Sequence, residues 1–238
     1  MLKIEKTVLP SPDQWDIIIE GMRNPMNSWE MSDSTICLGA DGFEDCTMSI
    51  TGTCPRHEDF RYDIFCMGEK DHKLMTSLAK GGPVHAKYRR MIPVFLTVNA
   101  PLYWWKEFDT YKVGTVCNSC STMHKIQAKE FAREDFSVEH LRNFKEQHWM
   151  VCMDNVIACL NVAREKFLET KDKIYWWQMI QLLPTSFNQK RTIMLNYEVL
   201  VNIYHSRKNH KLDEWHVFCD WIESLPYSEL ITGGDSDV

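Results

Sequence analysis

The sequence of 238 residues predicts a single α+β domain over residues 1–238, with a small antiparallel sheet flanked by helices and a helical C-terminal half. Apolar residues occupy every second position of Met91–Asn99, which is typical of a strand. After residue 135 the apolar residues recur at helical spacing instead. The sequence has no strand–helix alternation and no Gly-rich phosphate loop, so a doubly wound dinucleotide-binding fold is not expected.

Three short strands are expected in the first half of the chain, at Ser34–Leu38, Thr47–Ile50 and Met91–Asn99. Pro93 cannot donate a hydrogen bond to a neighbouring strand. Its place near the start of the third strand therefore indicates either an edge strand or the first position of a strand.

Six helices complete the expected fold. They cover residues 71–80, 104–108, 135–169, 174–183, 192–207 and 212–224. Asp135 or Ser137 is expected to cap the longest helix, and Gly81-Gly82 to end the first. The helix over 192–207 is expected to bury four apolar residues: Leu195, Val199, Leu200 and Ile203.

The composition limits the partners and the compartment. The net charge of −6 argues against broad binding to nucleic acid or to anionic membranes, which usually needs a basic face. The first residues contain no apolar run that would serve as a signal peptide, and no stretch is long enough to span a membrane. A cytoplasmic protein is therefore expected, without a nucleic-acid or membrane partner.

The nine cysteines indicate reduced thiols, because their number is odd and their spacing irregular. Cys152, Cys159 and Cys219 fall in helical apolar patterns and are expected in the core. Cys117 and Cys120 have the spacing of a zinc or redox pair, but no second pair of this kind exists. Incidental thiols are the favoured interpretation, and no metal site is expected.

Two further segments have open interpretations. Asn118–Thr122 is a run of small polar residues that suits a phosphate or carbonyl oxygen, or else an ordinary loop. Gly81–Arg90 is a basic loop that suits an anion, although a solvated loop is favoured. The adjacent tryptophans at 104–105 and 176–177 suit stacking on a cofactor, but packing is favoured.

The segment 190–216 concentrates positive charge in an acidic protein. Five potential cations follow one another near a turn: Arg207, Lys208, His210, Lys211 and His216. This pattern indicates an anionic ligand, because arginine binds phosphate with two parallel hydrogen bonds. A helix C-terminus whose dipole is complemented by cations explains the pattern equally well. No nucleophilic triad can be recognised, so no catalytic side chain is assigned.

Residues 182–215, LLPTSFNQKRTIMLNYEVLVNIYHSRKNHKLDEW, resemble the C-terminal signature of the flavin-dependent thymidylate synthases. That signature has a Leu-Pro, a basic residue, a helix with Asn, Leu and Arg, and a turn with His. The residues that match it in order and spacing are Leu183-Pro184, Lys190 or Arg191, Asn196, Leu200, Arg207 and His210.

Residues 100–124, APLYWWKEFDTYKVGTVCNSCSTMH, resemble an earlier segment of the same family. Glu107 stands where the family has Gln, and Thr110-Tyr111-Lys112 stands where it has Arg-His-Arg. Thr115 falls at a family Ser, and His85 has the spacing of the family's flavin-contacting His.

The resemblance implies a homotetramer that binds FAD and a pyrimidine deoxynucleotide, most simply dUMP. It also implies a one-carbon unit from methylenetetrahydrofolate and a flavin hydride supplied by NADPH. The residues implied for substrate binding are Glu107, Ser119, Ser121, Lys190, Arg191 and His216. The residues implied for cofactor binding are His85, Lys112, Asn202, His205, Arg207 and His210.

Three alternatives remain open at this stage. Glu107 in place of Gln can accept a hydrogen bond from an exocyclic amine, so a variant acting on dCMP is one of them. The second is a non-catalytic descendant that binds a nucleotide, motivated by the replaced Arg-His-Arg. The third and weakest is a metal-binding protein that uses Cys117, Cys120 and histidines.

Overall fold

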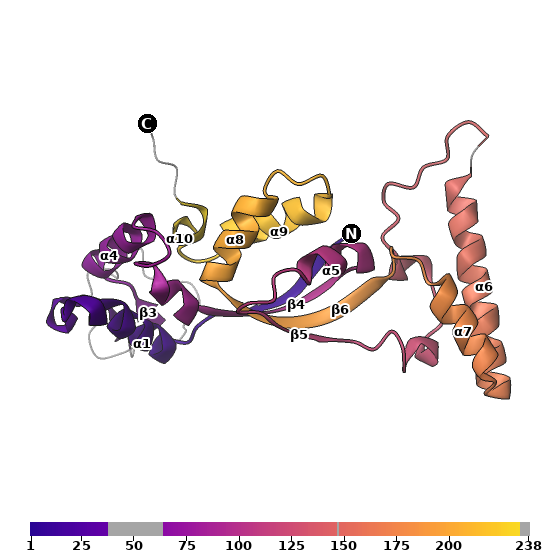
Figure 1. Cartoon of the computed structure of the whole chain (residues 1–238), viewed down its shortest axis with the longest axis horizontal. Helices are drawn as coiled ribbons and strands as arrows, with labels where there is room; N and C mark the ends of the chain where they lie inside the picture. The colour runs from indigo at the N-terminus through magenta and orange to yellow at the C-terminus, as the bar shows by residue number, and fades with distance from the viewer. Residues whose placement is uncertain (38–63, 147, 234–238) are drawn as a thin grey trace. The chain divides into compact units, whose positions relative to one another are not determined.

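A computed structural model describes residues 1–37, 64–146 and 148–233 (Figure 1). The chain divides into two compact units that are each assembled from separate segments. Unit 1 contains 1–7, 95–194 and 207–220, and unit 2 contains 8–94, 195–206 and 221–238. The single domain expected from the sequence stays a prediction. The strand expected at Thr47–Ile50 lies outside the described residues.

A four-stranded sheet provides the framework of unit 1. Its strands lie in the order β1 (Lys3–Val8), β4 (Pro93–Pro101), β6 (Asn188–Asn196) and β5 (Val116–Ser119). β5 pairs with β6 in antiparallel register. The expected α+β class with a small antiparallel sheet is confirmed.

The strand expected from alternation is β4. Val94, Leu96 and Val98 are at most 1% exposed, and the residues between them are more exposed to solvent. β4 lies between β1 and β6, so it is not an edge strand. Pro93 is its first residue, where no ladder hydrogen bond is lost.

Four α-helices lie wholly or largely in unit 1: α5 (Leu102–Phe108), α6 (Trp149–Thr170), α7 (Lys173–Leu182) and α9 (Asp213–Glu223). The helices expected over 104–108, 174–183 and 212–224 are thereby confirmed. Two short 3-10 turns also lie here, η4 (Ile126–Ala128) and η5 (Arg133–Asp135).

The long helix begins later than expected, at Trp149 instead of after Asp135 or Ser137. Both expected caps are engaged elsewhere. The Asp135 carboxylate accepts from the backbone N–H of Ala132, and the Ser137 hydroxyl donates to Asn188. A capping side chain cannot start a helix when other partners occupy it.

Two expected core cysteines on this helix are exposed. Cys152 and Cys159 face solvent, whereas Cys219 on α9 is buried as expected. The buried face of α6 is formed by Met153, Leu160 and Ala163. Leu141 and Phe144 lie within the expected helix 135–169 but precede α6, and both are exposed.

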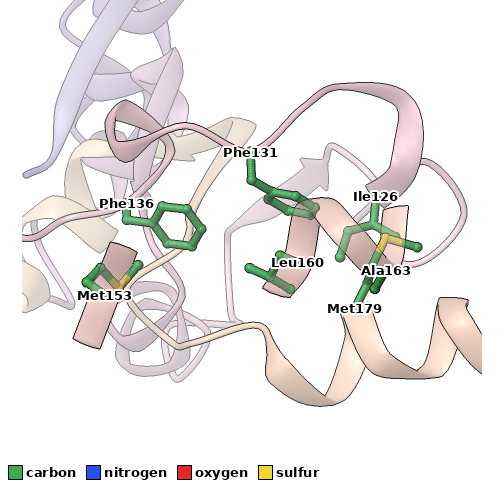
Figure 2. Packing of buried hydrophobic residues seen from close by; sticks show 7 residues of the cluster. All are labelled: Ile126, Phe131, Phe136, Met153, Leu160, Ala163 and Met179. Atoms are coloured by element: carbon green, nitrogen blue, oxygen red, sulfur yellow. The ribbon is translucent and has the colours of Figure 1, made fainter. Parts of the chain in front are cut away.

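A hydrophobic cluster joins α6 and α7 to the segment before them (Figure 2). The two helices follow each other across Lys171, which is left-handed at φ 58°, and Asp172, whose side chain caps α7. The cluster comprises Ile126, Phe131, Phe136, Met153, Leu160, Ala163 and Met179.

The helix expected over 192–207 is a strand followed by a helix. β6 runs to Asn196, and α8 (Tyr197–Arg207) begins at the next residue. The Asn196 side chain accepts from the backbone N–H of Val199 at 3.1 Å and so caps α8. The four residues of the expected face are buried, but Leu195 is buried as part of the sheet.

Unit 2 contains most of α8 and the remaining elements. Its helices are α1 (Pro12–Arg23), α4 (Glu69–Lys80) and α10 (Glu229–Thr232), with 3-10 turns η1 (Asn24–Met26), η2 (Trp29–Met31) and η3 (Lys87–Met91). β2 (Thr35–Cys37) and β3 (Ile64–Cys66) pair in antiparallel register. The strand expected from residue 34 and the helix expected over 71–80 are confirmed within the described residues.

The sequence reasoning missed α1, although its start has a recognisable signal. The Ser11 hydroxyl accepts from the N–H of Gln14, the Gln14 side chain accepts from the N–H of Ser11, and Pro12 opens the helix. This arrangement is a capping box.

We expect Ser11→Ala to lower the free energy of unfolding by about 1 kcal/mol, because the backbone N–H of Gln14 loses its cap. Thermal unfolding of the full chain measures the effect. Ser228→Ala is the matched control, since Ser228 precedes α10 without a side-chain cap hydrogen bond. Equal losses in the two variants would contradict the role of the Ser11 cap.

Candidate functional site

The first half of the candidate site is a set of side chains around one carboxylate in unit 1. Glu107 lies on the last turn of α5, and its Oε2 accepts from Arg207 Nη1 at 2.8 Å and from Trp215 Nε1 at 3.0 Å. His210 Nε2 lies 3.3 Å from the same oxygen. Together with Tyr111, these residues form what we call the Glu107 cluster.

Arg207 is held on several sides in this cluster. Its Nε donates to the Tyr111 hydroxyl at 2.9 Å, and its guanidinium carbon lies 4.8 Å from the centre of the Trp215 ring. A guanidinium over an indole face gains cation–π attraction. Because Arg207 is the last residue of α8 and is only 18% exposed, its position is fixed by the protein itself.

The tautomer of His210 follows from its hydrogen bonds. The backbone N–H of Leu212 donates to His210 Nδ1 at 3.2 Å, so this nitrogen acts as the acceptor. The ring proton is therefore assigned to Nε2, which faces Glu107. All three neighbours of Glu107 Oε2 are hydrogen-bond donors.

A second contact ties α9 to α5 next to the cluster. The Tyr103 hydroxyl donates to the buried carboxylate of Glu214. Burial first, and then this hydrogen bond, raise the pKa of Tyr103. Tyr103 thus stays protonated as a donor, and the helix that carries Trp215 is held against the helix that carries Glu107.

The second half of the site surrounds Arg191 on β6. Its Nη1 donates to Asp109 at 2.7 Å, and its Nε donates to Gln189 at 2.9 Å. The guanidinium carbon lies 4.4 Å from the centre of the Trp105 ring, and Cys117 Sγ is 3.8 Å from Nη1. We call these residues the Arg191 cluster.

A small pocket lies beside both clusters. Its volume is about 120 Å³, and its lining residues are Phe108, Asp109, Tyr111, Lys112, Thr115 and Cys117. Within the described residues, the buried Thr115 Oγ1 has no hydrogen-bond partner. A pocket of this size has room for a phosphate-sized group.

The structure brings together part of the substrate set implied by the resemblance. Glu107 and Arg191 are in the two clusters, and Ser119 pairs with Arg191 in the strand register. Ser121 accepts from the N–H of His124 and so shapes a turn. His216 is on α9, with Nδ1 3.9 Å from Asp213.

The implied cofactor set is divided between the two units. Arg207 and His210 belong to the Glu107 cluster, and Lys112 lines the pocket, all in unit 1. Three members lie exposed in unit 2, namely His85, Asn202 and His205.

The basic character expected for 190–216 is largely compensated. Lys190 Nζ lies 2.6 Å from Glu5 Oε2, and Arg191 and Arg207 are paired with Asp109 and Glu107. Each of these three cations therefore already has a carboxylate partner. An anionic ligand there must share its donors with protein carboxylates.

Sequence reasoning did not nominate Asp109 or Gln189, which position Arg191. Asp109 follows Glu107 by two residues at the end of α5, and this spacing of two acids was the available signal. Of the adjacent tryptophans, Trp104 and Trp105 are fully buried, which confirms packing as their role.

In residues 1–37, 64–146 and 148–233, no three or more His, Cys, Asp and Glu side chains gather in a way that suits a metal ion. In the same ranges, no helix has the length and apolarity that crossing a membrane requires.

The fold is similar to that of two solved thymidylate synthase structures. Two structures of thymidylate synthase X (ThyX) from Helicobacter pylori, both with FAD and dUMP, match the chain with TM-scores of 0.58 and 0.57. Each is 14% identical in sequence, and the matches cover 98% of this chain and 97% and 98% of those chains. No protein-family model and no curated protein matches the chain.

Proposed function

We propose that the chain is a flavin-dependent enzyme that transfers a one-carbon unit to C5 of a pyrimidine deoxynucleotide, as in the conversion of dUMP to dTMP. The observation that carries the proposal is the fold, which matches over 98% of the chain a protein whose structures hold FAD and dUMP. The proposal includes methylenetetrahydrofolate as the carbon donor, NADPH as the reductant, a homotetramer and a cytoplasmic location.

The pocket beside the clusters supports binding of part of FAD. Lys112 supplies an ammonium, and the unpartnered Thr115 hydroxyl supplies a second donor, a pair that suits a phosphate or carbonyl oxygen. Bound FAD, once reduced, supplies the hydride that completes the transferred carbon. His85, Asn202 and His205 are proposed as further flavin contacts.

Arg191 and Arg207 are proposed to contact the bound nucleotide or FAD through Nη2, the guanidinium nitrogen that makes no hydrogen bond within the described residues. Within the described residues, neither Arg191 nor Arg207 uses Nη2 in a hydrogen bond. Asp109, Glu107 and the aromatic rings hold each guanidinium in place, so little side-chain entropy is lost on binding. Ser119, Ser121, Lys190 and His216 complete the proposed substrate contacts.

Release of tritium from C5-labelled dUMP and dCMP tests the proposed reaction, because the C5 proton must leave when the carbon is attached. The full chain is incubated with FAD, NADPH and methylenetetrahydrofolate. We expect release above the level without protein. We expect Arg207→Ala to lower the rate about 10- to 100-fold, because a charged hydrogen bond is lost. No release from either nucleotide would contradict the proposal.

A second candidate is a nucleotide-binding protein without catalysis. The observation that favours it is the pairing of Arg191 and Arg207 with Asp109 and Glu107, which weakens the attraction for phosphate. This candidate predicts saturable binding of dUMP or dCMP without release of tritium, so the same assay separates the two functions.

A further inference from the structure

Glu107 presents one oxygen to the protein and leaves the other unused. Within residues 1–37, 64–146 and 148–233, the contacts from Arg207, Trp215 and His210 all reach Oε2, and no hydrogen bond reaches Oε1. The Glu107 side chain is 35% exposed, so a ligand can approach it from solvent. A carboxylate paired with a guanidinium is an acceptor and not a donor.

The unused Glu107 oxygen belongs to a group that is already joined to an unused donor. Arg207 Nη1 donates to Glu107 Oε2 at 2.8 Å, while Arg207 Nη2 has no hydrogen bond within the described part of the chain. Nη2 shares its carbon with Nη1, and Oε1 shares its carbon with Oε2. The ion pair therefore retains one unused acceptor and one unused donor.

Cytosine and uracil meet this combination differently. Cytosine carries an exocyclic amine at the end of its pairing edge, with an acceptor nitrogen next to it. The amine can donate to Glu107 Oε1 while the ring nitrogen accepts from Arg207. Uracil carries its ring N–H between two carbonyl oxygens. When this N–H donates to Glu107 Oε1 and one carbonyl oxygen accepts from Arg207, the second carbonyl oxygen lies close to the carboxylate and is repelled by it.

We infer that the ion pair of Glu107 and Arg207 reads the base and selects a cytosine nucleotide over a uracil nucleotide. The inference rests on the proposed function, because that function supplies the pyrimidine nucleotide. It assigns Arg207 to the base, whereas the resemblance implies a cofactor contact for this residue. Glu107 is a specificity-determining residue in this account. The hydrogen bonds from Arg207 and Trp215 fix its orientation, and His210 adds a third donor on the same side.

Equilibrium binding of dCMP and dUMP to the full chain, measured by calorimetry with and without FAD, tests the inference. We expect dCMP to bind about tenfold more tightly than dUMP, because only uracil brings a carbonyl oxygen against the carboxylate. Glu107→Gln should remove most of this preference, because the amide can turn its donor towards a carbonyl oxygen. The amide oxygen still accepts from Arg207 and Trp215, so the variant should fold, and its melting temperature checks this.

Glu130→Gln is the matched control, since it makes the same change of charge at an exposed position outside the two clusters. Its ratio of affinities should equal that of the wild type. A wild-type preference for dUMP, or an unchanged ratio in Glu107→Gln, would overturn the inference and leave the proposed function intact. Absence of binding by both nucleotides would overturn the proposed function as well.

Discussion

Asp71→Ala is expected to lower the free energy of unfolding by about 3–5 kcal/mol, because it leaves a buried arginine without its counter-charge. Asp71 is fully buried and accepts from Arg23 Nε at 2.5 Å. The hydroxyls of Ser32 and Ser34 each donate to it at 2.7 Å. The Arg23 side chain is only 4% exposed, so water cannot replace the lost carboxylate.

Urea unfolding of the full chain, followed by circular dichroism, measures this loss. Asp154→Ala is the control, since Asp154 also pairs with an arginine, Arg133, but both side chains are exposed. The control should change stability little. A similar loss in both variants would show that burial is not the reason why the Arg23–Asp71 pair stabilises the fold.

The contribution of Asp71 also depends on pH. Burial alone would raise the pKa of Asp71, but hydrogen bonds from Ser32, Ser34, Arg23 and the backbone of Asp33 outweigh it and lower the pKa. A lowered pKa stabilises the fold above the unfolded value of about 3.9, and this stabilisation is lost as pH falls through the folded value. The stability difference between wild type and Asp71→Ala should therefore narrow below about pH 4.

Trp104→Ala should cost about 3–5 kcal/mol in unit 1, because it opens a cavity in a packed aromatic cluster. Trp104 is fully buried, and its ring centre lies 4.8 Å from those of Trp105 and Trp215 and 5.1 Å from that of Phe108. Trp215 also donates to Glu107, so loss of this packing should loosen the candidate site.

Thermal unfolding followed by circular dichroism measures the effect of Trp104→Ala. Trp177→Ala on α7 is the control, because Trp177 is 42% exposed and its removal leaves a smaller cavity. If Trp177→Ala destabilised the chain as much as Trp104→Ala, the aromatic cluster would not be the main support of the site.

Elements with a strong local pattern could be predicted from the sequence. β4 alternates strictly, and α4, α7 and α9 end near glycine or proline. Residues 192–196 of β6 are predicted as the start of a helix, because Leu195 has helical spacing with Val199 and Leu200. Their actual structure depends on pairing with β4 and β5, which are distant in the sequence.

The candidate site was predictable only in part. The resemblance located Glu107, Arg191, Arg207 and His210, and the structure brings each into one of the two clusters. The carboxylate partners could not be foreseen, since Asp109 and Arg191 are 82 positions apart. Such long-range pairs decide which cations of a basic segment remain free.

The central claim, that this fold binds a flavin, is tested most directly by titrating the full chain with FAD and following the visible absorbance. We predict saturable binding with a change in the flavin bands. We also predict weaker binding by Lys112→Ala, which removes an ammonium from the pocket. A flavin spectrum that stays unchanged at FAD concentrations well above that of the protein would contradict the claim.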